Sequence, residues 1–251
     1  MTMMKPNHKP LSKRSLKASE MVARDIVTFI TEGGYSTGDM LPREQLMQEQ
    51  FQVGRGSLRE ALRLLEVQGL IAIKPGVSGG PIVGEASATG LARTLSLFFR
   101  MLGATYEDVS DALLILAPLV ARRAARNGNR DEIAKELQEV LEVSECDGQT
   151  ATESTRNAAQ FHTTLNRLNG NPVLALLTEA LGALFNEHIV THSDASGILP
   201  HCRNDHRLIA DAVIARDSDN AAQLSYDHMK SLIEFHRTRV PAIFNEPVQW
   251  R

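Results

Sequence analysis

The sequence contains little cysteine and few aromatic residues. Among its 251 residues are two cysteines, Cys146 and Cys202, so no disulfide framework is expected and a reducing cytoplasm is the default location. Aromatic residues make up 5% of the chain, whereas hydrophobic residues of all kinds make up 43%. The core must therefore be built mainly from Leu, Ala, Ile and Val, which favours a mainly helical protein.

Long apolar runs and common catalytic motifs are absent as well. No apolar run reaches the roughly 18 residues that are needed to span a bilayer, so we expect no membrane contact. The first 20 residues lack an apolar core, which argues against a secretory signal. The sequence contains no H-E-x-x-H, G-x-S-x-G or P-loop pattern, and this weakens the case for an enzyme.

Charge is distributed unevenly along the chain, although the formal net charge is only -3. Residues 1–80 carry eleven Lys and Arg against eight Asp and Glu, whereas residues 81–251 carry sixteen against twenty-two. A basic first part on an acidic body is typical of a protein whose first part meets an anion. The first 18 residues are polar and basic, and we expect a disordered tail there or, alternatively, an arm that touches phosphates.

The pattern of apolar and turn residues predicts three helices and a hairpin, followed by a long helical region. From about residue 88 helical periodicity continues toward the C-terminus, and turn signals divide it into six or seven helices, enough for an antiparallel bundle. The expected elements of the first part are a helix capped by Ser19, helices over 44–51 and 57–68, and strands over 70–73 and 81–83.

The third predicted helix combines an apolar stripe with a cluster of arginines. Its apolar residues fall at i, i+3, i+4 and i+7, which is the spacing of one buried face: Leu58, Ala61, Leu62 and Leu65. Arg59 and Arg63 lie off that stripe, and Arg55 precedes them at the same end of the helix. Exposed cations at a helix N-terminus suit a phosphate or a guanine edge.

Two helices joined by a short glycine-containing turn match the helix-turn-helix pattern, in which the second helix reaches base edges. The hairpin would then lie against the duplex as a wing, with Lys74 as a phosphate contact. The alternative is an ordinary helical subdomain whose arginines belong to a solvated face.

Two segments carry a family resemblance that favours DNA binding. The sequences "GDMLPRE" and "VGRGSLREALRLLEVQGL" resemble the winged-helix domain of the GntR family of bacterial transcriptional regulators over residues 19–84. One departure is Gly54, where the family commonly has Ser or Thr. The resemblance implies that DNA is contacted by seven residues, the last two in the wing: Arg43, Gln45, Arg55, Ser57, Arg59, Lys74 and Gly76.

The helical region carries a second resemblance. The segments "FHTTLNRLNGNPVLALL" and "NDHRLIADAVIARDSDNAAQLSYDHMKSL" resemble motifs of the FCD ligand-binding domain of the FadR-type subfamily. The resemblance implies a divalent metal held by three histidines, His162, His206 and His228, together with an aspartate.

Here Ala158 occupies the position of that aspartate. Three imidazoles suit Zn²⁺ or Ni²⁺, and water or an effector carboxylate could complete the coordination. The alternative is three histidines that form hydrogen bonds around a polar pocket without metal. We also consider Cys202 as an additional thiolate ligand.

A further departure concerns the effector. Where many relatives carry "R-x-x-L-E-P", this chain has "DALLILAPLVARRAA", with Leu113 and Ala117 at the polar positions. We therefore expect an effector pocket that includes Leu113, Ala117 and Ala158, and an apolar or amphiphilic, lipid-like effector. The alternative is that Leu113 merely packs between helices.

Together these observations predict a mainly α protein with an N-terminal winged helix-turn-helix and a C-terminal all-α antiparallel bundle. The expected function is a cytoplasmic transcriptional regulator, not an enzyme, that binds a palindromic operator as a homodimer and responds to a small-molecule effector. A metal-dependent hydrolase and a DNA-binding module without ligand are the alternatives. The predicted parts are a tail (1–18), a winged-helix domain (19–84), a linker (85–91), an FCD-like domain for effector binding and dimerisation (92–240) and a C-terminal tail (241–251).

Overall fold

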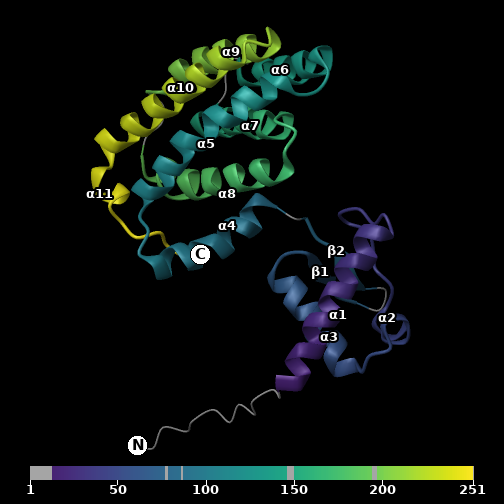
Figure 1. Ribbon diagram of the computed structural model, residues 1–251. Helices are drawn as coiled ribbons and strands as arrows, with labels where there is room; N and C mark the ends of the chain where they lie inside the picture. The colour runs from purple at the N-terminus through teal and green to yellow at the C-terminus, as the bar shows by residue number, and fades with distance from the viewer. Residues whose placement is uncertain (1–12, 77–78, 86, 146–149, 194–196, 251) are drawn as a thin grey trace, which may run out of the picture. The chain divides into compact units, whose positions relative to one another are not determined.

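The computed structural model describes residues 13–76, 79–85, 87–145, 150–193 and 197–250. The chain divides after Ser87 into an N-terminal unit and a C-terminal unit (Figure 1). The division falls inside the segment 85–91 that we predict to be a linker.

The N-terminal unit consists of three helices and a two-stranded sheet. They are α1 (Lys13–Glu32), α2 (Glu44–Phe51), α3 (Arg55–Val67), β1 (Ile71–Lys74) and β2 (Gly80–Val83). Helix α1 begins before Ser19, which is buried inside it, so Ser19 is not the N-cap and the predicted disorder does not apply to residues 13–18. The segment "KRSLKA" contains no helix breaker, and the helix therefore extends through it. The rest of the predicted tail, residues 1–12, lies outside the described residues.

Helix α3 lies at the centre of this unit. The stripe predicted for it is confirmed, since Leu58, Ala61, Leu62 and Leu65 are all buried. They share one core with Val22 and Ile26 of α1 and with Met47 of α2. Gly69 ends the helix at φ +73°, a left-handed conformation that glycine adopts without strain. The strands then pair antiparallel, with Ile71 opposite Val83, and form the hairpin.

The C-terminal unit is built from helices. They are α4 (Ala88–Leu102), α5 (Tyr106–Arg126), α6 (Arg130–Glu145), α7 (Ala151–Leu168), α8 (Pro172–His188), the short η1 (Val190–His192), α9 (Leu199–Ile214), α10 (Ser218–Arg239) and α11 (Pro241–Phe244). Thr105 and Thr150 begin α5 and α7 with reciprocal capping boxes, and Asn171 caps α8. Helix α4 includes residues 88–91 of the predicted linker.

Helix α5 runs through the middle of the bundle and packs against α7, α8, α9 and α10 (Figure 1). One apolar cluster joins α5 to α6, α7 and α9, and a second joins it to α4, α8 and α10. The predicted fold class, a winged helix-turn-helix followed by an all-helical bundle, is confirmed.

The segment after residue 240 is part of the fold and not a free tail. Phe244 and Val248 are buried in the second cluster. The Val248 backbone N–H donates to the Ala104 carbonyl at 2.9 Å, and the Gln249 N–H donates to the Tyr106 hydroxyl at 3.2 Å. Two apolar anchors and these hydrogen bonds hold the segment against the start of α5, which corrects the prediction for residues 241–250.

One stretch of the helical unit, Pro172–His192, is long and apolar enough to cross a membrane by length and composition. It includes α8, whose residues Ala180, Leu184 and Phe185 are buried in the second cluster. A core helix of a bundle meets the same criterion, and we interpret α8 in that way.

Candidate DNA-binding surface and histidine cluster

The N-terminal turn of α3 carries exposed polar side chains. Arg55 and Arg59 are exposed and Ser57 is half-buried, while the apolar face of the same helix is buried. Gly54 precedes the helix as its N-cap and offers no side-chain hydrogen bond to the first backbone N–H groups. The turn therefore combines two guanidinium groups with unsatisfied backbone donors, an arrangement that favours an anion.

Arg59 forms an ion pair at the surface. Its Nε donates to Glu44 Oε2 at 2.9 Å, and the two side chains are 57% and 37% exposed. Arginine has five N–H donors, so this bond leaves the Nη groups of Arg59 for other partners. An exposed pair of this kind is worth little. Glu44 therefore orients Arg59 without burying it.

The other residues that the resemblance implies lie on α2 and the hairpin. Arg43 and Gln45 are exposed at the start of α2, and Lys74 is exposed at the end of β1. Gly76 in the following turn has φ +115°, which a residue with a side chain rarely adopts. All seven predicted contacts lie in the N-terminal unit, and six of them are exposed.

The three predicted histidines come together in the C-terminal unit. His162 of α7, His206 of α9 and His228 of α10 offer nitrogens that all lie within 4.8 Å of one another. The Nε2 atom of His228 is 3.2 Å from Nε2 of His206 and 3.4 Å from Nε2 of His162. His206 and His228 are buried and His162 is half-buried.

These separations fit one metal ion. Two nitrogens that bind a tetrahedral zinc at about 2.0–2.1 Å lie about 3.3 Å apart, close to the two separations from His228 Nε2. Three imidazoles fill three positions, and Ala158 leaves the place of the usual aspartate without a ligand atom. The donor set therefore suits a divalent ion with an open position for water or an oxygen ligand.

Burial keeps two of the three imidazoles, those of His162 and His206, neutral, as metal ligands must be. Burial, reinforced by the neighbouring His228, lowers the pKa of His162 to about 3. Burial, with His162 and His228 nearby, also lowers the pKa of His206 well below its ordinary value. His162 and His206 can therefore each offer a lone pair at neutral pH.

Asp205 orients one of the three ligands, a role that the sequence did not reveal. Its Oδ2 accepts a hydrogen bond from His228 Nδ1 at 3.1 Å, and it also lies 3.4 Å from His201 Nε2. When Nδ1 carries the proton, Nε2 of His228 keeps its lone pair toward His162 and His206. Asp205 directly precedes His206, but only the packing of α9 against α10 brings it to His228.

A cavity of about 50 Å³ adjoins the cluster. Its lining includes all three histidines, Ala158 and Cys202. Burial raises the pKa of the Cys202 thiol to about 12, so the sulfur is protonated at neutral pH and is a poor metal ligand. Leu113 and Ala117 are not among the lining residues; they pack in the apolar cluster of α5, α8 and α10. Of the three residues that we expected at the effector pocket, Ala158 lines this cavity.

The sequence also did not indicate a fourth histidine of the cavity wall. His236 of α10 is fully buried, and its Nδ1 is hydrogen-bonded to Ser193 Oγ. Its Nε2 has no hydrogen-bond partner among the described residues. It lies outside the two motifs that carry the resemblance, and a lone histidine on a helix has no sequence signal of its own.

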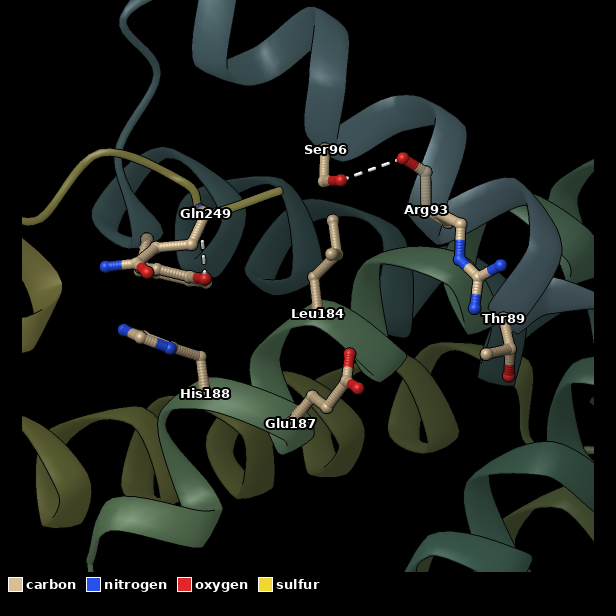
Figure 2. Close-up of a pocket in the computed structure, with 8 residues that line it drawn as sticks. Thr89, Arg93, Ser96, Leu184, Glu187, His188 and Gln249 are labelled. Carbon is tan, nitrogen blue, oxygen red and sulfur yellow. Dashed lines mark hydrogen bonds between the residues drawn. The ribbon is translucent and has the colours of Figure 1, made fainter. Parts of the chain in front are cut away.

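A second cavity lies between α4, α8 and the C-terminal segment (Figure 2). Tyr106 stacks on His188 with ring centroids 4.2 Å apart, and His188 Nε2 lies 3.2 Å from Glu246 Oε2. The Ser96 hydroxyl donates to the Arg93 carbonyl, as Figure 2 shows. Several polar groups here already have partners within the protein, so the histidine cluster is the stronger candidate site.

Comparison with known proteins agrees with both regions. Residues 18–79 match the family described as bacterial regulatory proteins, gntR family, and residues 108–231 match the FCD domain. The HTH-type transcriptional repressor NanR of Klebsiella aerogenes is 30% identical over 242 residues, covering 89% of this chain and 86% of the relative. The chain belongs to the GntR family.

Other similar proteins agree with this assignment. NanR of an Enterobacter species is 28% identical over 239 residues, with 89% of this chain and 86% of that protein covered. The solved structure of a Streptococcus agalactiae GntR protein has a TM-score of 0.65 at 21% identity, covering 86% of this chain and 99% of that one, and it supports the fold. As a GntR-family member with an FCD domain, the chain is a DNA-binding transcriptional regulator and not an enzyme.

Proposed function

We propose that this GntR-family protein acts in the cytoplasm as a homodimeric repressor that releases or tightens its hold on a palindromic operator when a small molecule binds its helical unit. The observation that carries the DNA-binding part is the exposed N-terminal turn of α3, with Arg55 and Arg59 on a helix whose other face is buried. We assign repression and not activation because the NanR relatives are named transcriptional repressors.

In this proposal α3 enters the major groove and Arg55 and Arg59 reach base edges or phosphates. The DNA backbone beside these bases is contacted by Ser57, Arg43 and Gln45. In the wing, Lys74 contacts a phosphate, and Gly76 lets the protein backbone come close to the DNA. The phosphate contacts make the affinity fall steeply with salt.

The test is an operator selection from random duplex DNA with the full-length protein, followed by binding measurements with Arg59→Ala. We expect this change to cost about 1–3 kcal/mol of discrimination at one base position. Arg123→Ala is the matched control, because Arg123 is an exposed arginine of α5 in the other unit. An unchanged base preference in Arg59→Ala would reject the assigned role.

The homodimer is supported by an apolar face on α4. Four neighbouring side chains of its last turns are 41–87% exposed: Leu97, Phe98, Met101 and Leu102. A contiguous exposed apolar stripe on a helix of a water-soluble bundle indicates a protein contact, and a second copy would bury it symmetrically.

Sedimentation of the full-length protein checks this assignment. We expect a dimer that Phe98→Asp combined with Met101→Asp converts to monomer, because charges would be buried in the interface. Val143→Asp is the control, since Val143 is a 52% exposed residue of α6. If the double variant stays dimeric, the dimer interface does not include this face of α4.

For the helical unit we propose that His162, His206 and His228 hold a divalent metal, zinc or nickel, and that the effector binds beside it in the cavity of about 50 Å³. Bound there, the metal would supply an open coordination position and a positive charge for an anionic group of the effector. The case for a lipid-like effector depended on Leu113 and Ala117; because both pack in the apolar core, it loses that support. A DNA-binding module without ligand remains the competing outcome, and it predicts a protein that binds neither metal nor small molecule.

The effector acts only if it binds one arrangement of the two DNA-binding units more tightly than the other. To test the role of the metal and the effector, operator affinity is measured with and without chelator and with candidate small molecules. An operator affinity that is insensitive to chelator and to every small molecule tried would favour the module without ligand.

A further inference from the structure

The cavity beside the histidine cluster has a second polar anchor, His236. The ring is fully buried, yet Nε2 has no hydrogen-bond partner among the described residues. A buried polar atom without a partner is unfavourable, and natural proteins keep few of them. His236 lines the same cavity as the three histidines, so a ligand in that cavity can supply the missing partner.

The ring of His236 is held in one orientation. Its Nδ1 is hydrogen-bonded to Ser193 Oγ at the end of η1. Phe185 and Phe235 meet the ring edge-on, with centroids 5.9 Å and 5.3 Å away. Because Ser193 engages Nδ1, Nε2 is the nitrogen left for a ligand, and the ligand meets a rigid partner.

The surroundings of His236 select the kind of group that it can bind. Burial, with some contribution from Arg239, lowers the pKa of His236 to about 4, so the ring is neutral at pH 7. No Lys or Arg is among the described residues that line the cavity. Arg239 acts on His236 but does not line the cavity, so a carboxylate beside His236 would contact no cation of the lining, whereas a hydroxyl or carbonyl oxygen needs none.

The size of the cavity sets a further limit. About 50 Å³ has room for a few non-hydrogen atoms, since roughly 10–15 Å³ holds one water. A long acyl chain would extend beyond this volume. A short acid with one further oxygen would fit, with its carboxylate toward the histidine cluster.

We propose that His236 Nε2 hydrogen-bonds an uncharged oxygen, a hydroxyl or a carbonyl, of a small carboxylic acid effector, and that Ser193 is the positioning residue that orients the ring. The inference rests on the proposed function, in which the cavity binds the effector and the three histidines hold the metal. It adds a specificity-determining residue at a second polar anchor of the cavity.

The test compares two probe acids that differ by one hydroxyl, propionate and 3-hydroxypropionate, on full-length protein loaded with Zn²⁺. Calorimetric titration should give about tenfold tighter binding of 3-hydroxypropionate to the wild type, as one hydrogen bond of good geometry provides. His236→Phe should bind both acids equally, at the affinity of propionate. His236→Gln, which keeps an N–H donor, should retain part of the preference. His192→Gln, a change at an exposed histidine of η1, should leave it intact.

A measurement without substitutions guards against a variant that misfolds. In the ¹⁵N spectrum of histidine-labelled wild type, 3-hydroxypropionate should shift the His236 Nε2 resonance and propionate should not. The assignment is overturned if wild type binds the two acids equally or binds neither. It is also overturned if His236→Phe keeps the preference for 3-hydroxypropionate. Zinc content, measured on every sample, separates this failure from a failure of the proposed function: if wild type carries no zinc, the metal proposal fails by itself.

Discussion

The two candidate sites of this protein are built in opposite ways. The proposed DNA contacts come from one continuous stretch, Arg43 to Gly76, and Arg59 keeps 57% of its side chain exposed. The proposed metal ligands come from three helices, His162 and His228 are 66 positions apart, and His206 is 1% exposed. DNA is bound on an exposed surface, whereas this histidine cluster is assembled from helices that are far apart in the sequence. The predictions below test this contrast, beginning with the largest effect.

The first prediction separates the two sites by function. His206→Ala should abolish zinc binding, because two remaining imidazoles hold the ion weakly, and should leave operator affinity without effector unchanged. Metal analysis of dialysed protein and operator titration measure the two properties. His192→Ala should keep about one zinc per chain. Full zinc occupancy in His206→Ala would reject the ligand set.

The second prediction concerns the support of α3. Leu62→Ala should lower the stability of the N-terminal unit by about 2–5 kcal/mol, because it leaves a cavity where the side chain was 3% exposed. Leu46→Ala should change it by less than about 0.5 kcal/mol, since that side chain is 56% exposed. Hydrogen exchange of the α3 amides reports both values. Equal effects would contradict the packing described for α2 and α3.

The third prediction tests Asp205 as the residue that orients His228. Asp205→Asn should weaken zinc binding about 10–100-fold, because the tautomer of His228 is no longer imposed. His201→Ala should alter zinc affinity by less than about twofold, since the His201 side chain is 56% exposed and its 3.4 Å contact with Asp205 contributes little. Competition with a zinc chelator measures both constants. A larger effect in His201→Ala than in Asp205→Asn would refute the assigned role.

The fourth prediction is the response of the zinc-free protein to acid. Burial lowers the folded-state pKa of His162 to about 3 and that of His236 to about 4, below the ordinary value of 6.5. The unfolded chain therefore binds protons first, and stability present above pH 6.5 is lost as the pH falls. We expect the free energy of unfolding to drop by about 1.4 kcal/mol per pH unit for each such histidine. Urea titrations at pH 7 and 5 measure the drop, and a helical unit of constant stability would contradict it.

The fifth prediction has the smallest effect. Gly54→Ser should stabilise the N-terminal unit by a few tenths of a kcal/mol, because Ser can cap α3 where glycine cannot. Gly54 has φ -68° and ψ 153°, and a Cβ there would meet no atom within 4 Å. Gly69→Ser is the opposing control, since φ +73° disfavours a side chain. Hydrogen exchange measures both changes, and a loss of stability in Gly54→Ser would reject the capping argument.

Predictions from sequence were most accurate where interactions are local. The bounds of α2 and the buried stripe of α3 follow from apolar spacing within a few residues. The start of α1 was missed although no helix breaker lies between Lys13 and Ser19. The docked segment after residue 240 was missed because contacts with residues far away in the chain hold it in place. The same holds for Leu113 and Ala117, whose residue types fit a pocket wall and a packed core equally well.

The amino-acid sequence by itself determined the winged helix with its arginines and the three histidines of the helical unit, since turn signals, helical spacing and motif residues act over short distances. Tertiary structure alone decided that His162, His206 and His228 converge, that Asp205 orients one of them, and that His236 faces the same cavity with a nitrogen unsatisfied. The physical reason is that convergence, burial and the pKa of a side chain depend on which helices pack together, and that packing involves residues far apart in the chain.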